Sequence, residues 1–213
     1  MKTEDINLIE SIQFGAYKKI VEYLAILQQV NNHVNLCSSK LQFSKLLNYV
    51  MRSVELHLTI LKFNSKSLIL DIGSGNGLPS IILSILGAKV IMVDSNSKKC
   101  AFLTLAVSKL NLDAKIINSR IEKVEAMQIP IAINNCITIT ALAFSTVKKL
   151  LNACIRNFEC LSHLNVSIFL MKGENIEYEI LEASKRFKFQ STIINSTYDE
   201  KSRILVLTDI SSK

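Results

Sequence analysis

The feature that most constrains the fold of this chain is an apolar strand pattern that leads directly into three alternating glycines. Residues 68–79 read LILDIGSGNGLP, so that Asp71 precedes the loop formed around Gly73, Gly75 and Gly77. Glycine tolerates a positive φ and lets backbone atoms approach a ligand closely. A helix that follows such a loop offers unpaired N–H groups in its first turn. The segment therefore predicts a strand–loop–helix unit built around a bound ligand.

Short apolar segments alternate with amphipathic segments along the rest of the chain. The predicted strands are 68–72, 89–93, 114–118, 137–140 and 166–171, and the predicted helices are 79–86, 97–110, 146–158 and 175–187. This alternation predicts an α/β fold with a mostly parallel sheet and right-handed crossovers. Two further predicted strands, 189–194 and 203–208, are separated by a polar loop without a helix. They predict an antiparallel pair at the sheet edge.

The N-terminal third carries helical rather than strand periodicity. Two apolar helical patterns, within residues 17–27 and 43–61, flank an asparagine-rich loop at residues 31–35. We therefore expect a helical extension over residues 1–64 and a ligand-binding α/β domain over residues 65–213.

A second acidic residue supports a nucleotide ligand. The strand pattern VIMVD ends at Asp94, 17 positions after Gly77. A carboxylate at this strand tip can accept hydrogen bonds from both hydroxyls of a ribose. Asp94 could instead cap the following helix, a role that Ser95 and Ser97 could share. The combination of strand, glycine loop and acidic residue favours ribose binding by Asp94 over helix capping.

A third polar segment, NSRIE, follows the third predicted strand at residues 118–122. In a nucleotide-binding sheet of this kind, the corresponding loop lies beside the adenine ring. Taken alone, Glu122 would be an ordinary charge in the first turn of a helix.

Charge and cysteine content place weaker limits on function. The chain has 25 basic and 18 acidic side chains, a net charge of +7 that suits RNA or simply a basic soluble surface. Its five cysteines show no C-x-x-C pair and no neighbouring histidine, which predicts reduced thiols and no metal site. No signal-peptide order is present at residues 1–10, and no apolar run reaches the roughly 18 residues of a membrane span. We therefore expect a cytoplasmic protein.

Together these segments resemble the RsmG/GidB family of small-subunit ribosomal RNA guanine-N7 methyltransferases over nearly the whole chain. Residues 71–80 match the family pattern D-x-G-S/T-G-x-G-x-P-G, with Ser80 in place of the last glycine. Residues 94–103 match D-S-x-x-K-K-x-x-F-L, the most specific of these motifs. Weaker matches are the x-R-x-E loop at 119–122, the K-G at 172–173, and Asn35-Leu36 in place of N-L-T.

The resemblance implies a Rossmann-like class I methyltransferase with a seven-stranded sheet, S-adenosylmethionine as cofactor and S-adenosylhomocysteine as product. It implies that Asp94 holds the ribose and that Ile121 and Glu122 flank the adenine. Lys172 is expected near the substrate. The expected partner is small-subunit ribosomal RNA or the small ribosomal subunit, bound by a monomer. The full set of expected cofactor residues is Asp71, Gly73, Gly75, Gly77, Leu78, Asp94, Ser95, Ile121, Glu122 and Ala141.

The chain departs from the family pattern mainly where the substrate is expected. Ala141 stands where the family's S-R-A segment has arginine. Residues 48–53, NYVMRS, replace R-H-x-x-D-S, so that Tyr49 and Arg52 replace histidine and aspartate, and Cys37 replaces threonine. Two alternatives therefore stay open: a cofactor- and RNA-binding homologue with reduced or lost catalysis, and a small-molecule methyltransferase.

Methylation of guanine N7 needs no general base, because N7 has a free lone pair and loses no proton on attack. The residues agree with this chemistry. Residues 140–143 read TALA and not the N-P-P-Y of exocyclic-amine enzymes, and Cys136 lacks the preceding proline of a nucleophilic cysteine. Expected RNA contacts are Arg52, Arg120, Lys148, Lys149, Lys172, Lys201 and Arg203.

Overall fold

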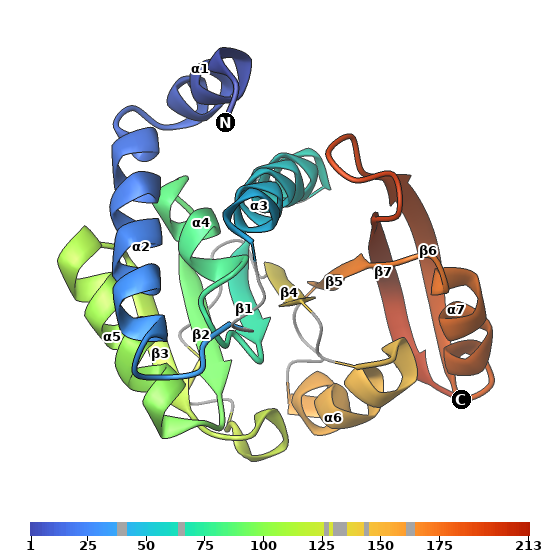
Figure 1. Cartoon of the computed structure of the whole chain (residues 1–213). Coiled ribbons are helices and arrows are strands. Elements are labelled where there is room, and N and C mark those ends of the chain that lie inside the picture. Colours follow the sequence, from blue (N-terminus) through green and yellow to red (C-terminus); the bar gives the residue numbers. More distant parts are fainter. Residues whose placement is uncertain (38–41, 64–66, 126–127, 130–135, 143–144, 161–164) are drawn as a thin grey trace.

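The computed structural model describes residues 1–37, 42–63, 67–125, 128–129, 136–142, 145–160 and 165–213. In this part of the chain, seven strands form one sheet in the order β3-β2-β1-β4-β5-β7-β6 (Figure 1). The strands are β1 (Leu68–Ile72), β2 (Val90–Asp94), β3 (Ala114–Asn118), β4 (Cys136–Leu142), β5 (Asn165–Lys172), β6 (Phe187–Asn195) and β7 (Arg203–Ser212). The strands β1 to β5 are parallel, and β7 is antiparallel to β5 and β6. The predicted α/β sheet with an antiparallel C-terminal pair is confirmed.

Helices cover both faces of the sheet (Figure 1). They are α1 (Thr3–Ile12), α2 (Ala16–Asn31), α3 (Phe43–Phe63), α4 (Ser80–Ile85), α5 (Ser97–Leu110), the 3-10 helix η1 (Ile121–Lys123), α6 (Val147–Cys160) and α7 (Ile176–Ser184). Successive side chains of a strand point to opposite faces. Ile69 and Met92 accordingly pack with helices α1–α5, whereas Leu70 and Ile91 pack with η1, α6 and α7.

The central strands bring several chain segments to one edge of the sheet. Every residue of β1 and β2 is buried, as expected of parallel strands that are covered on both faces. Leu70 of β1 pairs with Ile91 of β2 and with Ile139 of β4. The carboxyl ends of these parallel strands therefore lie side by side, and we call this side of the sheet the carboxyl edge. The glycine loop and the loop after β3 follow strands that end there, and Asp94 is the last residue of β2.

The N-terminal region contains three helices in its described residues, where the sequence pattern predicted two. Gly15, with φ +78°, separates α1 from α2 in a conformation that other residues rarely adopt. Helices α2 and α3 share one apolar core with α4 and β1. The expected boundary between residues 64 and 65 lies outside the described residues.

Two C-terminal boundaries differ from the prediction. Helix α7 ends at Ser184, and Phe187 begins β6 instead of ending the helix. The ring of Phe187 is buried in the same core as Ala183 of α7. The pairing of β6 with β7 reaches from Asn195 to Phe187, which makes both strands longer than the local pattern indicated. Within the described ranges, no helix is both long and apolar enough to cross a membrane.

Candidate active site

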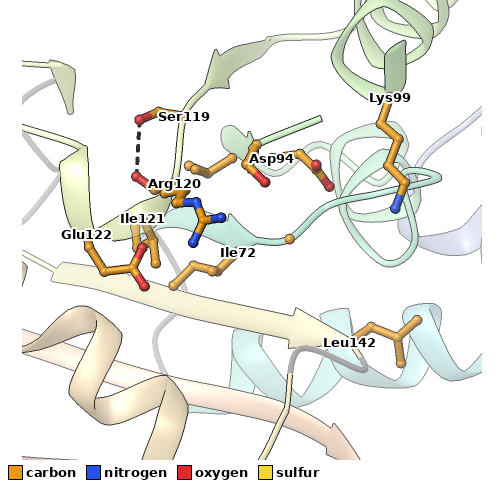
Figure 2. A pocket seen from close by; sticks show the side chains of 11 residues that line it. Ile72, Asp94, Lys99, Ser119, Arg120, Ile121, Glu122 and Leu142 are labelled. Carbon is orange, nitrogen blue, oxygen red and sulfur yellow. Dashed lines mark hydrogen bonds between the residues drawn. The ribbon is translucent and has the colours of Figure 1, made fainter. Parts of the chain in front are cut away.

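A cavity of about 400 Å³ lies at the carboxyl edge, where β1, β2, β3 and β4 end (Figure 2). Its lining residues are Ile72, Gly73, Val93, Asp94, Ser95, Lys99, Ser119, Arg120, Ile121, Glu122 and Leu142. The volume falls in the range of small-molecule sites, roughly 300–1,000 Å³. Apolar side chains from three strands and η1 lie beside two carboxylates and two basic side chains, a lining that suits a flat ring with attached polar groups.

Asp94 is buried at the tip of β2 and organises two neighbouring segments. Its Oδ2 accepts a hydrogen bond from the Gly75 N–H at 2.9 Å, and its Oδ1 accepts one from the Asn96 N–H at 2.8 Å. The cap of α5 is Asn96, whose side chain accepts from the N–H groups of Lys98 and Lys99. The helix-cap role considered for Asp94, Ser95 and Ser97 therefore belongs to Asn96, and the Asp94 carboxylate faces the cavity.

The glycine loop is held closely against the end of β2. The N–H groups of Gly73 and Ser74 both donate to the Val93 carbonyl, at 2.8 and 3.1 Å. A Cβ on Gly77 would lie 2.5 Å from Cγ1 of Ile81, so this position has no room for a side chain. Of the three glycines, Gly73 lines the cavity, and Gly75 and Gly77 shape the loop.

Two contacts from the N-terminal helical region hold the loop from the other side. The Tyr23 hydroxyl of α2 donates to the Asn76 carbonyl at 2.8 Å, and the Asn76 Nδ2 donates to Cys37 Sγ at 3.0 Å. Burial raises the pKa of Tyr23 well above its ordinary value, which keeps the hydroxyl protonated as a donor. The sequence pattern predicted no role for Tyr23 or Asn76, since no local signal reports a contact across 53 residues.

Three expected cofactor residues lie behind the cavity wall. Leu78 is buried in the core beneath helices α2–α5, and Asp71 is buried below the glycine loop. Ala141 is buried among the residues that pack with α6, while its neighbour Leu142 lines the cavity. Strand alternation explains the last difference, because Ala141 and Leu142 point to opposite faces. Asp71, Leu78 and Ala141 are therefore not among the residues that line the cavity.

Asp71 links β1 to β4 under the loop. Its Oδ1 accepts a hydrogen bond from the Thr140 hydroxyl at 2.8 Å, and the Ser74 hydroxyl donates to its main-chain carbonyl at 3.0 Å. Burial raises the pKa of the Asp71 carboxyl to about 6, against the opposite effect of the neighbouring hydroxyls. The carboxyl therefore titrates well above its ordinary value of 3.8.

We expect Asp71→Asn to stabilise the cofactor-free protein by an amount that grows between about pH 4 and about pH 7. A raised folded-state pKa means that Asp71 favours folding fully below 3.8 and loses this contribution as the pH rises through about 6. The difference between the two pKa values corresponds to a loss of up to about 3 kcal/mol in the free energy of unfolding. Asparagine has no charge and avoids this loss, and its side-chain oxygen can still accept the Thr140 hydroxyl. Urea unfolding of both proteins across this pH range measures it.

The comparison of the two proteins cancels other titrating groups. Burial lowers the pKa of His57 to about 4, so this histidine weakens folding as the pH falls, in both proteins alike. A stability difference between Asp71→Asn and wild type that stays constant with pH would contradict the prediction.

The loop after β3 forms one wall of the cavity. The Ser119 N–H donates to the Asp94 carbonyl at 3.1 Å, which joins the ends of β2 and β3. Arg120, Ile121 and Glu122 line the cavity next to this contact (Figure 2). Arg120, which was expected to contact RNA, thus lies among the expected cofactor residues. Lys99 of α5 also lines the cavity. It is the second lysine of the D-S-x-x-K-K motif, so the motif could have indicated its place in the site.

Lys172 lies at the end of β5 in a partly buried ion pair. Its Nζ is 2.8 Å from Oε2 of Glu179 and also donates to the Ser145 carbonyl. The same Glu179 oxygen accepts the Val147 N–H at 2.8 Å, at the first residue of α6. Lys172 and Glu179 thus hold the start of α6 in place, and Lys172 is not among the residues that line the cavity.

The remaining residues expected to contact RNA lie in two places, on α6 and around the loop between β6 and β7. Lys148 lies on α6, 4.0 Å from Glu182 of α7. Arg203 donates to the main-chain carbonyls of Glu200 and Ser202. Arg52 is buried and pairs with Asp199 at 3.6 Å, so it is not a free surface charge. The exposed Lys149 and Lys201 lie on α6 and on the β6–β7 loop.

None of the described cysteines lines the cavity. Cys100 and Cys154 are buried free thiols, and burial raises the pKa of Cys154 to about 12. Cys136 begins β4, at the opposite end of the strand from the cavity residue Leu142. The side chain of Cys160 lies outside the described residues. Among the described side chains, no group of three His, Cys, Asp or Glu residues is placed to hold a metal ion.

The cavity lies at one edge of a mostly parallel sheet with this strand order. The glycine loop after β1 and the carboxylate at the tip of β2 come together there. Together they define a Rossmann-like class I methyltransferase, a class that uses S-adenosylmethionine.

Solved structures agree on the fold. The magnesium protoporphyrin IX methyltransferase of Synechocystis PCC 6803, with bound SAM, aligns with a TM-score of 0.55 at 14% identity, covering 86% of this chain and 95% of that one. An O-methyltransferase from Bacillus cereus in complex with SAH aligns with a TM-score of 0.53 at 16% identity, covering 88% and 91%.

Sequence comparison identifies the family, whereas the solved structures show only the fold. The family model described as rRNA small subunit methyltransferase G matches residues 16–205. The ribosomal RNA small subunit methyltransferase G of Rickettsia africae (strain ESF-5) is 34% identical over 200 residues, 91% of this chain and 95% of the relative. That of Rickettsia bellii (strain OSU 85-389) is 32% identical over 90% and 95%. The chain belongs to the rRNA small subunit methyltransferase G family.

Proposed function

We propose that the protein transfers a methyl group from S-adenosylmethionine to N7 of a guanosine in small-subunit ribosomal RNA. The observation that carries the proposal is the cavity at the carboxyl edge, in which Asp94 and the loop at 119–122 face the glycine loop. Membership of the family supports ribosomal RNA as substrate. Guanine N7 can accept the methyl group without a general base.

The chemistry of the lining fits the cofactor. Each Asp94 oxygen already accepts one backbone N–H and keeps a further lone pair for a ribose hydroxyl. Ile121 and Glu122 flank the space for the adenine ring, and the exposed backbone of Gly73 lets a ligand approach closely. When bound, the cofactor supplies an electrophilic methyl group on a sulfonium centre.

The residues of this chain then act by aligning the cofactor with the acceptor base. The walls of the cavity hold two reactants in one geometry, which converts a bimolecular step into an effectively unimolecular one. Guanine N7 attacks with a lone pair that carries no proton, so no side chain at the site has to remove one. The Lys172–Glu179 pair supports the start of α6 beside the end of β4, where we place the acceptor base.

Small ribosomal subunits from a strain that lacks the methyl mark provide the test. We expect the protein and methyl-labelled cofactor to place label on 7-methylguanosine after digestion to nucleosides, with free ribosomal RNA as a parallel substrate. Label on another position would contradict the N7 assignment. Saturable binding of S-adenosylhomocysteine without any transfer would favour a cofactor- and RNA-binding homologue, and methylation of small molecules alone would favour the third alternative.

We propose further that the protein acts as a monomer in the cytoplasm, where the small ribosomal subunit is available. A single chain already forms a cavity of about 400 Å³, a size that suits a small-molecule ligand. Light scattering of the purified protein at several concentrations tests the monomer, and a mass that rises to that of a dimer would contradict it.

A further inference from the structure

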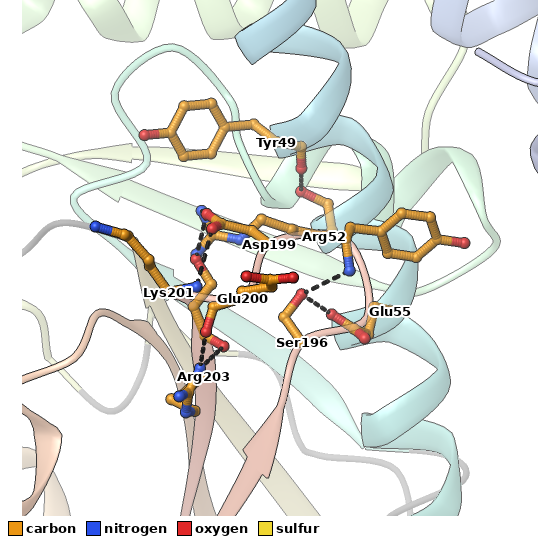
Figure 3. Close-up of polar contacts among 11 residues, drawn as sticks. Tyr49, Arg52, Glu55, Ser196, Asp199, Glu200, Lys201 and Arg203 are labelled. Atoms are coloured by element: carbon orange, nitrogen blue, oxygen red, sulfur yellow. Dashed lines mark hydrogen bonds and ion pairs between the residues drawn. The ribbon is translucent and has the colours of Figure 1, made fainter.

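A second pocket, of about 410 Å³, lies between α3 and the loop that joins β6 to β7 (Figure 3). Its lining residues are Lys45, Asn48, Tyr49, Arg52, Asp199 and Lys201. We propose that this α3 pocket binds one nucleotide of the RNA strand next to the methylated guanosine, with a phosphate on Lys45 and Lys201 and a base on the Tyr49 ring. The inference rests on the proposed function and adds a second contact point for the same substrate.

The α3 pocket lies at the same edge of the sheet as the cofactor cavity. The loop between β6 and β7 lies at the carboxyl edge, because Arg203 at the start of β7 pairs with Lys172 at the end of β5. Glu55 and Arg52 of α3 contact Ser196 and Asp199 of this loop. Across this edge Leu142 of β4 pairs with Met171 of β5, which pairs with Ile204 at the start of β7. Two strand spacings, about 10 Å, therefore separate the strand ends beside the two pockets. A short stretch of one RNA strand can span this distance.

The charges of the α3 pocket favour an anion. Asp199 is its one lining acid, and its Oδ2 lies 3.6 Å from Nη1 of Arg52. Arg52 therefore offsets the charge of Asp199. Lys45 and Lys201 are exposed, and neither forms an ion pair with any residue that the structure describes. The pocket consequently presents two positive charges that a phosphate can neutralise.

Tyr49 gives the pocket an aromatic surface. The Arg52 guanidinium lies 5.3 Å from the centre of the Tyr49 ring and holds it in place. Figure 3 shows the Tyr49 ring and the Lys201 amine extending to the same side of α3. Single-stranded RNA is bound by aromatic rings that stack on bases next to cations that contact phosphates. An aromatic ring in the same pocket as two lysines therefore favours a nucleotide over an acidic peptide.

The two walls of the pocket are locked together before any ligand binds. Glu55 of α3 accepts hydrogen bonds from the Ser196 hydroxyl at 2.6 Å and from the Thr197 N–H and hydroxyl at 2.8 and 2.9 Å. Asp199 accepts the Ser202 hydroxyl at 2.6 Å and the Lys201 N–H at 3.1 Å. Because the loop is already ordered against α3, binding loses little conformational freedom.

The test measures binding of a labelled single-stranded RNA of about ten nucleotides to the full chain loaded with S-adenosylhomocysteine. We expect Lys45→Gln/Lys201→Gln to weaken binding about tenfold and to reduce the slope of log affinity against log salt by about one. Tyr49→Leu should weaken binding about tenfold with an unchanged salt slope, and Tyr49→Phe should restore it. Lys109→Gln/Lys188→Gln is the matched control, because both lysines are exposed on α5 and at the far end of β6.

Equal RNA affinity for the pocket variant and the matched control would overturn the inference. So would a pocket variant that keeps its RNA affinity but loses binding of poly-glutamate, which would assign the pocket to an acidic protein. Unchanged affinity for S-adenosylhomocysteine checks that each variant is folded. Failure of the wild-type protein to methylate small subunits would defeat the proposed function separately, since RNA binding is measured without transfer.

Discussion

Asp94→Ala is expected to raise the dissociation constant for S-adenosylhomocysteine at least about a hundredfold and to abolish methyl transfer. Two hydroxyl donors to a carboxylate contribute roughly 1.5–3 kcal/mol each, and alanine removes both. The same change leaves the Gly75 and Asn96 N–H groups without their acceptor, which loosens the loop around the cavity. Calorimetric titration with S-adenosylhomocysteine measures the first effect directly.

Two further variants separate binding from folding. Asp94→Asn keeps one acceptor oxygen without the charge, so its affinity should lie between that of alanine and wild type. Asp113→Ala is the matched control, because Asp113 is exposed and pairs only loosely with Lys89, at 3.8 Å. It precedes β3 and so lies at the opposite edge of the sheet from the cavity. Undiminished binding by a folded Asp94→Ala protein would defeat the methyltransferase mechanism proposed for this cavity.

Gly77→Ala is expected to lower the free energy of unfolding by about 3 kcal/mol. The φ of Gly77 is +89°, which strains an alanine, and its Cβ would lie 2.5 Å from Cγ1 of Ile81 and 3.2 Å from Cδ2 of Leu103. Strain of this kind costs about 1 kcal/mol, and overpacking a core adds roughly 1–3 kcal/mol. Urea unfolding of the cofactor-free protein gives the difference.

The chain offers separate controls for the backbone strain and for the overpacking at Gly77. Gly15 also has a positive φ, +78°, but a Cβ there meets nothing within 4 Å, so Gly15→Ala should cost only about 1 kcal/mol. In an Ile81→Ala background the 2.5 Å contact is gone and the 3.2 Å contact with Leu103 is left, so the cost of Gly77→Ala should fall toward that of Gly15→Ala. If Gly77→Ala is no worse than Gly15→Ala in the wild-type background, the close packing of the loop on α4 is wrong.

The sequence predicted the parts of the site that a short segment encodes. The strand at 68–72, its glycine loop and Asp94 each lie within a local pattern, and the fold of a parallel sheet brings their ends together. At the end of β4, the residue that lines the cavity is the neighbour of an expected one. Leu142 rather than Ala141 lines the cavity, because the alternation of a strand decides which side chain faces it.

Local sequence by itself determined the strand–helix order, the glycine loop and the acidic residue that faces the cavity, since hydrophobic periodicity and backbone freedom are properties of neighbouring residues. Only the tertiary structure decided the partners of distant polar groups: Tyr23 with Asn76, Arg52 with Asp199, and Lys172 with Glu179. Arg52 and Lys172 carry charges that the sequence assigned to RNA and substrate. Burial makes an unpaired charge costly, so each is paired inside the protein, and no local pattern reveals which partner the packing brings near.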